Sequence, residues 1–330
     1  MITCIIRVDA SKEIGYGHLM RCLALGEQLR KSFDILYLVR HNDSIDKIRQ
    51  QGFRVYEIPS DVDDEEVMIS FTSKFPNAIW IIDIKKQFSR GFLPELKKHA
   101  NLLLLIENLS HDMEAADGVL FPAAHLDEKI LDPWLDKKER YRVLSGWDWI
   151  ILRDELLNIA SITRDFPVVV TTGGSDPEGV FFKLWDLLRD QKIHVIFLVG
   201  ESFSFRDNLP SQDVYLKIKD YDVEYIARAC SVISTFGSSI TECLYLKKPV
   251  ISVAHSIDNA YGSSVLSRRT PACFDLGYFK DLDREMLINA INTYQEPCKE
   301  IMDWLRECPI DGKGAERVKE IHRCISPNAK

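Results

Sequence analysis

Residues 7–22, which read RVDASKEIGYGHLMRC, restrict the possible folds of this chain more than any other stretch. The apolar run before them, residues 2–6, is typical of a buried parallel strand, and the apolar residues at their end recur at a spacing of three and four, as in an amphipathic helix. Gly15 and Gly17 allow a tight turn, and a ligand can approach their backbone because glycine has no Cβ. The N–H groups of the first helical turn face the same space, so the sequence predicts a loop that binds an anion.

Three polar side chains accompany this loop. His18 stands where the loop becomes the helix, Asp9 follows the strand, and Arg7 precedes Asp9. Ligands of open α/β sheets bind at the carboxyl ends of the strands, which is where these residues are expected. On spacing alone two interpretations stay open, because Met20 replaces the third glycine of the dinucleotide fingerprint and a histidine at a helix start often only hydrogen-bonds its neighbours.

The length and the pattern indicate the architecture. A chain of 330 residues exceeds the ~100 to 200 residues of a usual domain, so we expect two domains. We place the first at residues 1–150 and the second at residues 151–330, with the connection between about 143 and 165. Short apolar runs alternate with helical patterns in both halves, which predicts an α/β fold with parallel sheets.

Composition excludes several classes of protein. Hydrophobic residues make up 46% and charged residues 28%, which argues against a disordered or fibrous chain, and a net charge of −8 argues against nucleic acid as a partner. The eight cysteines show no C-x-x-C spacing and are expected to be reduced core residues. No apolar run reaches the ~18 residues of a membrane span, and the first run is too short for a signal peptide. We therefore expect a cytoplasmic protein with no membrane span.

Two acids end predicted strands of the first half. Residues 78–83 form a buried apolar run that ends at Asp83, and residues 102–106 form another that is followed by Glu107. Carboxyl ends of parallel strands share one edge, so both acids are expected at the edge that carries His18. Either could orient an imidazole or bind a sugar hydroxyl. We favour Asp83, because simple exposure at a strand end explains Glu107 equally well.

The second half repeats the opening design. Residues 166–172 read as a buried strand that continues into Gly173-Gly174-Ser175-Asp176-Pro177. Asp176 is a predicted helix N-cap and Pro177 a predicted first helical residue. Amides at such a helix start suit a phosphate, and plain capping chemistry is the alternative interpretation.

A further nucleotide-binding pattern follows the predicted strand at residues 231–234. Gly237, Ser238 and Ser239 begin a helix, and Glu242 lies about one turn further on. Backbone N–H groups and hydroxyls can hold a diphosphate, and a carboxylate one turn away can accept hydrogen bonds from the ribose. The pattern therefore predicts a nucleotide site.

Several of these strings resemble one protein family. Arg-x-Asp-Ala-Ser at residues 7–11 and Ile-Gly-x-Gly-His-x-Met-Arg-Cys-Leu at residues 14–23 resemble the opening of the bacterial sugar-nucleotide hydrolases of pseudaminic acid biosynthesis and their spore-coat polysaccharide relatives. Gly-Gly-Ser-Asp-Pro at residues 173–177 is similar to a string of the same family, and residues 246–251 resemble a motif of two-Rossmann glycosyltransferases. The resemblance covers almost the whole chain. It implies two Rossmann-like domains facing a cleft, as in the glycosyltransferase-B fold.

The resemblance also implies an activity. Members of the family remove UDP from UDP-2,4-diacetamido-2,4,6-trideoxy-β-L-altropyranose without a metal or other cofactor, by attack of water at the sugar C1. The histidine that matches His18 is their catalytic base. On this basis we assign His18 and Asp83 to catalysis; Arg7, Asp9, Gly15, Gly17, Arg21 and Asn259 to the sugar substrate; and Gly173, Gly174, Ser175, Gly237, Ser238, Ser239 and Glu242 to the nucleotide.

The chain departs from the family at several positions. Phe236 replaces the first glycine of a Gly-Gly-Ser string, and Asn259 is followed by Ala260 where the family has glutamine. Trp149 stands where the family has an aromatic residue, in a passage that otherwise differs, and core packing explains this tryptophan equally well.

Two alternatives to the hydrolase therefore stay open. The first is a glycosyltransferase that passes the sugar to an acceptor hydroxyl, since fold does not fix function. The second is a non-catalytic protein that binds nucleotide sugars, which the presence of His18 disfavours.

Overall fold

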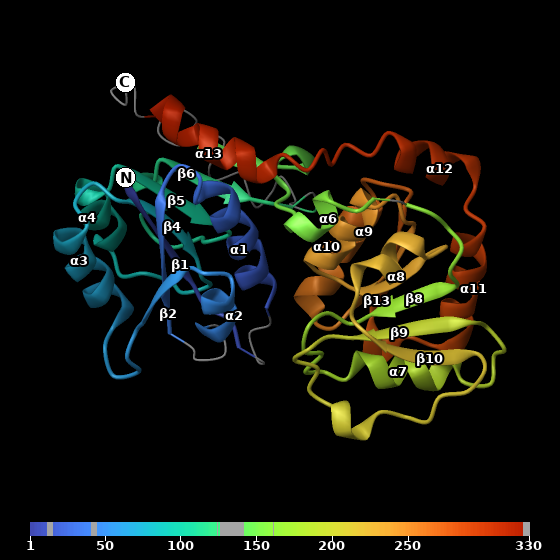
Figure 1. Cartoon of the computed structure of the whole chain (residues 1–330). Coiled ribbons are helices and arrows are strands. Elements are labelled where there is room, and N and C mark those ends of the chain that lie inside the picture. The colour runs from blue at the N-terminus through green and yellow to red at the C-terminus, as the bar shows by residue number, and fades with distance from the viewer. Residues whose placement is uncertain (12–15, 41–44, 124, 126–141, 161, 326–330) are drawn as a thin grey trace. The chain divides into compact units, whose positions relative to one another are not determined.

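The computed structural model describes residues 1–11, 16–40, 45–123, 125, 142–160 and 162–325 (Figure 1). Gly15 lies outside the described residues. The chain forms two compact units: unit 1 comprises Met1–Arg153 with Gly312–Lys330, and unit 2 comprises Asp154–Asp311. The chain passes between the units twice, once after Arg153, within residues 143–165, and once between Asp311 and Gly312.

Unit 1 is built on a seven-stranded parallel sheet. Its strands, in the order in which they lie in the sheet, are β3 (Arg54–Glu57), β2 (Asp34–Val39), β1 (Thr3–Val8), β4 (Ile79–Asp83), β5 (Leu102–Ile106), β6 (Gly118–Phe121) and β7 (Arg142–Ser145). Its helices are α1 (Gly17–Leu29), α2 (Ile45–Gln50), α3 (Asp64–Lys74), α4 (Phe92–His99) and α13 (Gly314–Ile325), with 3₁₀ turns η2 (Met113–Ala115) and η3 (Trp147–Trp149).

Two apolar cores cover the two faces of this sheet. Alternate residues of β1 point to opposite faces: Ile6 packs in the core beneath α1, α2 and α13, and Ile5 packs in the core beneath α3 and α4 (Figure 1). All five residues of β4 are buried, as expected for a central parallel strand with helices on both faces. The continuous apolar runs seen in the sequence follow from this two-sided burial.

Unit 2 is built on a six-stranded parallel sheet. Its strands, in sheet order, are β10 (Leu216–Asp220), β9 (Val195–Val199), β8 (Val168–Thr171), β11 (Val232–Thr235), β12 (Val250–Ala254) and β13 (Cys273–Tyr278). Its helices are α6 (Asp154–Leu157), α7 (Val180–Leu188), α8 (Val223–Arg228), α9 (Ser238–Tyr245), α10 (Ile257–Ser267), α11 (Arg284–Gln295) and α12 (Lys299–Arg306), with 3₁₀ turns η4 (Arg206–Asn208) and η5 (Phe279–Asp281).

Both sheets reverse their strand order once. In unit 1 the reversal lies between β1 and β4, and in unit 2 it lies between β8 and β11. In doubly wound sheets the loops that follow the two strands at such a switch point diverge and leave room for a ligand. Each unit is thus a Rossmann-like α/β unit with a defined position for a binding site.

The last helix corrects the expected domain boundary. The range 151–330 assigned it to the second domain, but α13 packs in unit 1 through Ala315, Val318 and Ile321. Arg317 also donates from Nη1 to the carbonyl oxygen of Asp148 at 2.9 Å. The amphipathic helix buries its apolar stripe on the core beside α1, a long-range choice that a local pattern does not specify.

Within the described ranges, none of the helices combines the length and the apolar character that crossing a membrane requires.

Candidate functional site

Four charged or titratable side chains meet at the switch point of unit 1. His18 and Arg21 come from the first turns of α1, Asp83 is the last residue of β4, and Glu107 directly follows β5. The parallel pairing of β1 with β4 sets Val8 opposite Asp83, which brings the start of α1 to the end of β4. The sheet topology therefore assembles residues that are far apart in the sequence.

Asp83 is the centre of this cluster. Its side chain is fully buried, and Oδ1 lies 2.7 Å from Nδ1 of His18. Arg21 donates from Nε to Oδ2 and from Nη2 to Oδ1, each at 2.6 Å. Burial by itself would raise the pKa of the Asp83 carboxyl, but Arg21 and His18 hold that pKa well below the ordinary value of 3.8. Asp83 is therefore ionised and can only accept hydrogen bonds.

The ionised state of Asp83 determines which ring nitrogen of His18 carries the hydrogen that faces it. Because an ionised carboxylate has no hydrogen to give, Nδ1 of His18 carries the hydrogen of the 2.7 Å contact, and in the neutral imidazole the lone pair is then on Nε2. The His18 side chain is 15% exposed, so the ring reaches solvent while its Nδ1 edge is held. The pair has the geometry of a general base and its orienting acid.

Arg21 links the two acids. Besides Asp83, its Nη2 donates to Oε2 of Glu107 at 2.9 Å. Although burial opposes it, the Arg21 charge holds the pKa of the Glu107 carboxyl below its usual range. The sequence assigned Arg21 to the substrate, but in this structure its Nε and Nη2 are engaged with the two carboxylates and its side chain is only 13% exposed.

Cys22 also hydrogen-bonds Asp83. Its Sγ–H donates to Oδ2 of Asp83 at 3.3 Å, and burial raises the pKa of the Cys22 thiol well above its ordinary value, so that the hydrogen is retained. Sequence reasoning classed Cys22 as a core residue and missed this contact. Its position one residue after Arg21, on the buried side of α1, was the available signal.

Arg7 and Asp9 belong to a second, neighbouring network. Two nitrogens of Arg7 donate to the two carboxylate oxygens of Asp9 at 2.6 Å each, and Nη2 also donates to Asp64 at 3.1 Å. The backbone N–H of Arg40 donates to Asp9 at 2.8 Å. The Arg7 side chain is fully buried while that of Asp9 is 16% exposed, so of the two only Asp9 reaches the surface.

Gly17 is the exposed first residue of α1. Tyr16 precedes it as N-cap and makes no side-chain capping hydrogen bond, and the first turn contains no acidic residue. Among the described residues, neither the N-cap nor the first turn supplies a carboxylate to the first amides of α1, which suits the predicted anion site.

The first glycine loop of unit 2 follows β8. Gly173 has φ 81°, a backbone conformation that favours glycine, and Gly174 is exposed while Ser175 is buried. The loop packs closely on the end of β9, because a Cβ on Gly200 would lie 2.6 Å from the carbonyl oxygen of Gly174. Gly173 also lies beside the end of β11, because a Cβ added to Gly173 would lie 3.8 Å from Oγ1 of Thr235.

Asp176 accepts the backbone N–H groups at the start of α7, where the sequence predicted a phosphate. The helix begins at Val180, three residues later than the sequence suggested, and Asp176 accepts the N–H groups of Val180 at 3.0 Å and Phe181 at 2.9 Å. The α7 amides are thus occupied by a carboxylate of the chain itself. Burial raises the pKa of Asp176 to about 6. The loop glycines remain candidates for contact with the nucleotide, but not through these two amides.

The start of α9 has no side-chain cap from its N-cap residue. Gly237 and Ser238 are exposed and Ser239 is half-buried, and the N-cap residue Gly237 has no side chain with which to cap the helix. Glu242 lies one turn further along the helix with 8% of its surface exposed. In unit 2, the start of α9 is therefore the better candidate for a phosphate.

Asn259 lies next to this helix start. Its side-chain Nδ2 donates to the carbonyl oxygen of Phe236 at 3.3 Å, and its backbone N–H donates to the N-cap residue Ser256 at 3.2 Å. Because β11 and β12 are neighbours in the sheet, the loops after them bring Asn259 and Gly237 to one edge. The described residues of unit 2 therefore place the predicted nucleotide residues around β8 and β11, with Asn259 beside them.

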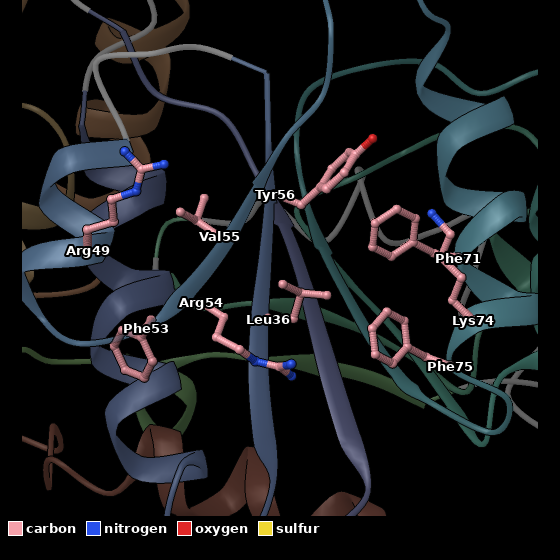
Figure 2. Close-up of a pocket in the computed structure, with 9 residues that line it drawn as sticks. All are labelled: Leu36, Arg49, Phe53, Arg54, Val55, Tyr56, Phe71, Lys74 and Phe75. Carbon is pink, nitrogen blue, oxygen red and sulfur yellow. The ribbon is translucent and has the colours of Figure 1, made fainter.

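A separate hollow of about 530 Å³ lies at the edge strand of unit 1. Figure 2 shows Arg49 and Phe53 on one side of β3 and Phe71 and Phe75 on the other. The lining residues are Leu36, Arg49, Phe53, Arg54, Val55, Tyr56, Phe71, Lys74 and Phe75. It contains none of the predicted site residues and lies at β3, whereas His18 lies at the switch between β1 and β4.

The described residues contain no group of three or more histidines, cysteines or acids arranged to hold a metal ion.

Sequence comparison identifies one distant relative. No family model matches the chain. An uncharacterized protein of Methanocaldococcus jannaschii, MJ1062, is 24% identical in an alignment over 269 residues that covers 74% of this chain and 54% of the relative. The chain thus spans about half the length of that curated relative.

Solved structures resemble the chain over almost its whole length. A glycosyltransferase from Rickettsia africae matches with a TM-score of 0.61 at 12% identity, covering 99% of both chains. Arabidopsis thaliana UGT89C1 complexed with UDP matches with a TM-score of 0.62 at 13% identity, covering 98% of this chain and 99% of that one. Acinetobacter baumannii MurG matches with a TM-score of 0.58 at 12% identity, covering 98% and 100%. At such identities the likeness concerns the fold, and the two Rossmann-like sheets of this chain have the glycosyltransferase-B fold.

Proposed function

We propose that this chain is an enzyme that cleaves a nucleotide-linked sugar at its anomeric carbon, with His18 as general base. The observation that carries the proposal is the contact between His18 and the ionised, fully buried Asp83, which in the neutral imidazole leaves the lone pair on Nε2 of a partly exposed ring. A base oriented in this way typically contributes ~10² to 10⁴ in rate.

The proposed reaction is a single displacement. Nε2 of His18 takes the proton of an incoming hydroxyl as its oxygen bonds to the sugar C1. The bond between C1 and the diphosphate oxygen breaks, and its electron pair leaves with the nucleotide. Asp83 stabilises the imidazolium that forms and holds the ring in place.

The nucleotide is assigned to unit 2. The first amides of α9 and the hydroxyls of Ser238 and Ser239 suit the diphosphate, and Glu242 suits the ribose. The match to UGT89C1 with bound UDP supports a nucleotide site in a unit of this fold. Donors at a helix start stabilise the negative charge that develops on the leaving diphosphate.

The nucleophile distinguishes two candidate activities. Glycosyl transfer to an acceptor hydroxyl is the first, because the solved structures that match over the whole chain include several glycosyltransferases. Hydrolysis is the second, because residues 7–11 and 14–23 resemble the hydrolases of pseudaminic acid biosynthesis. For the second activity we propose a UDP-linked diacetamido-trideoxy sugar as substrate.

The release of nucleotide tests both activities. The protein is incubated with a panel of UDP- and CMP-linked N-acetylated amino sugars, with and without a mixture of sugar acceptors, and free nucleotide is measured together with the anomeric form of the product. Release without an acceptor identifies a hydrolase, and release that requires an acceptor identifies a transferase. Binding of UDP with no turnover of any donor, under either condition, would contradict an enzymatic role.

A further inference from the structure

Glu107 occupies a strained position beside the candidate base. It follows β5 with φ 50°, in the left-handed region that non-glycine residues rarely adopt, and its backbone N–H donates to the carbonyl oxygen of Leu120 at 2.9 Å. Its side chain turns to Arg21 and is 28% exposed. Strained residues of this kind often gather at functional sites, which makes the partner of Glu107 informative.

Arg21 could donate a hydrogen bond to Nδ1 of His18 and so favour the tautomer with hydrogen on Nε2. Its Nη2 lies 2.9 Å from Nδ1 of His18. If Nη2 donated a hydrogen across this contact, Nδ1 would be the acceptor and the imidazole hydrogen would move to Nε2. Nε2 would then have no lone pair with which to remove a proton.

A count of hydrogens shows where those of Nη2 go. A guanidinium Nη2 carries two hydrogens, and Arg21 directs one to Oδ1 of Asp83 at 2.6 Å and one to Oε2 of Glu107 at 2.9 Å. The single Nε hydrogen goes to Oδ2 of Asp83 at 2.6 Å. Both Nη2 hydrogens therefore have a carboxylate oxygen as acceptor, and the 2.9 Å contact with Nδ1 of His18 can only share one of them.

We propose, building on the role of His18 as general base, that Glu107 is a positioning residue that fixes the tautomer of His18. By accepting the second Nη2 hydrogen of Arg21, Glu107 limits the donation of Arg21 to Nδ1. The imidazole hydrogen therefore stays on Nδ1, facing Asp83, and the lone pair stays on Nε2. Glu107 acts through Arg21 and touches no reacting atom.

Two substitutions separate this role from general support. In Glu107→Ala the Nη2 hydrogen loses its carboxylate acceptor and Nδ1 of His18 is a nearby one, so the share of the tautomer with hydrogen on Nε2 rises although Asp83 still favours hydrogen on Nδ1. Glu107→Gln keeps the shape and an acceptor oxygen but loses the charge, so it holds the hydrogen less strongly. A smaller rise of the tautomer with hydrogen on Nε2 is expected for Glu107→Gln than for Glu107→Ala.

Nitrogen NMR measures the tautomer directly. The full chain is labelled with ¹⁵N-histidine and studied without any ligand, at a pH high enough to keep the imidazoles neutral. Long-range ¹H–¹⁵N correlations distinguish a protonated ring nitrogen from an unprotonated one, and His18→Asn identifies the His18 signals. Wild type is expected to show hydrogen on Nδ1, and Glu107→Ala to show a measurably larger share of hydrogen on Nε2.

Asp112→Ala is the matched control. Asp112 is another acid of the segment between β5 and β6, with φ 58°, and it accepts the N–H of Gly91 at 2.6 Å, away from His18. Its loss should leave the His18 signals unchanged. A wild-type protein with hydrogen on Nε2 would overturn the proposal. Glu107 variants that keep the wild-type tautomer ratio would overturn it as well. If Glu107→Ala does not fold, the measurement on Glu107→Gln decides. The measurement uses no substrate, so failure to turn over a nucleotide sugar would count against the proposed activity and leave the tautomer result standing.

Discussion

Nδ1 of His18 lies 2.7 Å from Oδ1 of Asp83, although 65 positions separate the two residues in the chain. The two side chains meet because β1 and β4 are adjacent in the sheet. His18 lies in the helix that follows β1, and Asp83 is the last residue of β4. This pair joins the first helix to the centre of the sheet, and it underlies the first two predictions.

Replacing His18 should separate catalysis from binding. We expect His18→Ala to lower the turnover of a UDP-linked amino sugar by at least ~10²-fold while UDP affinity stays within a few-fold, because the base acts in the transition state. Initial rates and calorimetric titration with UDP measure the two effects. His99→Ala, at a side chain that is 50% exposed beside Glu95, is the control and should change neither. Equal loss of turnover and of affinity would make His18 a binding residue instead.

Asp83 should contribute strongly to stability as well as to rate. Its buried carboxylate accepts from His18, Arg21 and Cys22, so Asp83→Asn should lower the free energy of unfolding by about 3–5 kcal/mol at pH 7. The pKa of Asp83 is lower in the folded chain than in the unfolded chain, so its contribution is present above the unfolded value and is lost as the pH falls.

Urea unfolding at several pH values checks this sign. Wild type should lose stability between about pH 5 and pH 3, and Asp83→Asn should lose less over the same interval. Parallel pH profiles of the two proteins would show that the Asp83 charge is not stabilised by its neighbours.

The start of α9 should tolerate a methyl group that a bound nucleotide does not. A Cβ on Gly237 meets no atom within 4 Å, so Gly237→Ala should change the free energy of unfolding by no more than about 1 kcal/mol. A diphosphate on the α9 amides would meet the added methyl group, so UDP affinity should fall by roughly tenfold, equivalent to about 1.4 kcal/mol.

Gly200→Ala is the contrasting variant. Its Cβ would lie 2.6 Å from the carbonyl oxygen of Gly174, and relieving the clash should cost about 1–3 kcal/mol of stability. Thermal unfolding and UDP titration of both variants separate the two effects. Unchanged UDP affinity in Gly237→Ala would move the phosphate away from α9.

Glu242 should recognise the ribose. A hydrogen bond to a charged group contributes ~1.5 to 3 kcal/mol, so Glu242→Ala should weaken UDP binding by roughly tenfold to a hundredfold and leave pyrophosphate binding unchanged. Calorimetry with UDP and with pyrophosphate measures both. If pyrophosphate binding falls as much as UDP binding, the carboxylate supports the loop and does not contact the ribose.

Asp176 should make unit 2 more stable in mild acid. Burial raises its folded pKa to about 6, so its ionised form opposes folding at pH 7, and protonation removes that opposition as the pH falls. Between pH 7 and pH 5 the gain should be about 1 kcal/mol, estimated from 1.36 kcal/mol for each pKa unit. Asp176→Asn should lack this gain when the urea unfolding of the two proteins is compared. An equal pH dependence in both would assign the effect to other groups.

The sequence alone predicted the elements whose pattern is local. Apolar runs such as residues 78–83 identify buried parallel strands because both sides of such a strand are covered, and the alternation of strands and helices indicated two Rossmann-like sheets. Asp83 could be placed on the edge of His18 for the same reason, since all strands of a parallel sheet end at one edge. β6 and β7 were not predicted, because the segment that contains them shows little periodicity and is interrupted by breakers such as Pro122 and Gly146.

The tertiary structure decided what depends on partners distant in the sequence. α13 packs in unit 1 because its apolar stripe finds the core beside α1, and Asp176 closes α7 because its carboxylate folds back onto two amides. Arg21 was assigned to a substrate from its position in a string, but the distribution of its hydrogens between Asp83 and Glu107 exists only where three separate elements meet. A sequence pattern records which residues can form such contacts, whereas the geometry of the folded chain determines which donor reaches which acceptor.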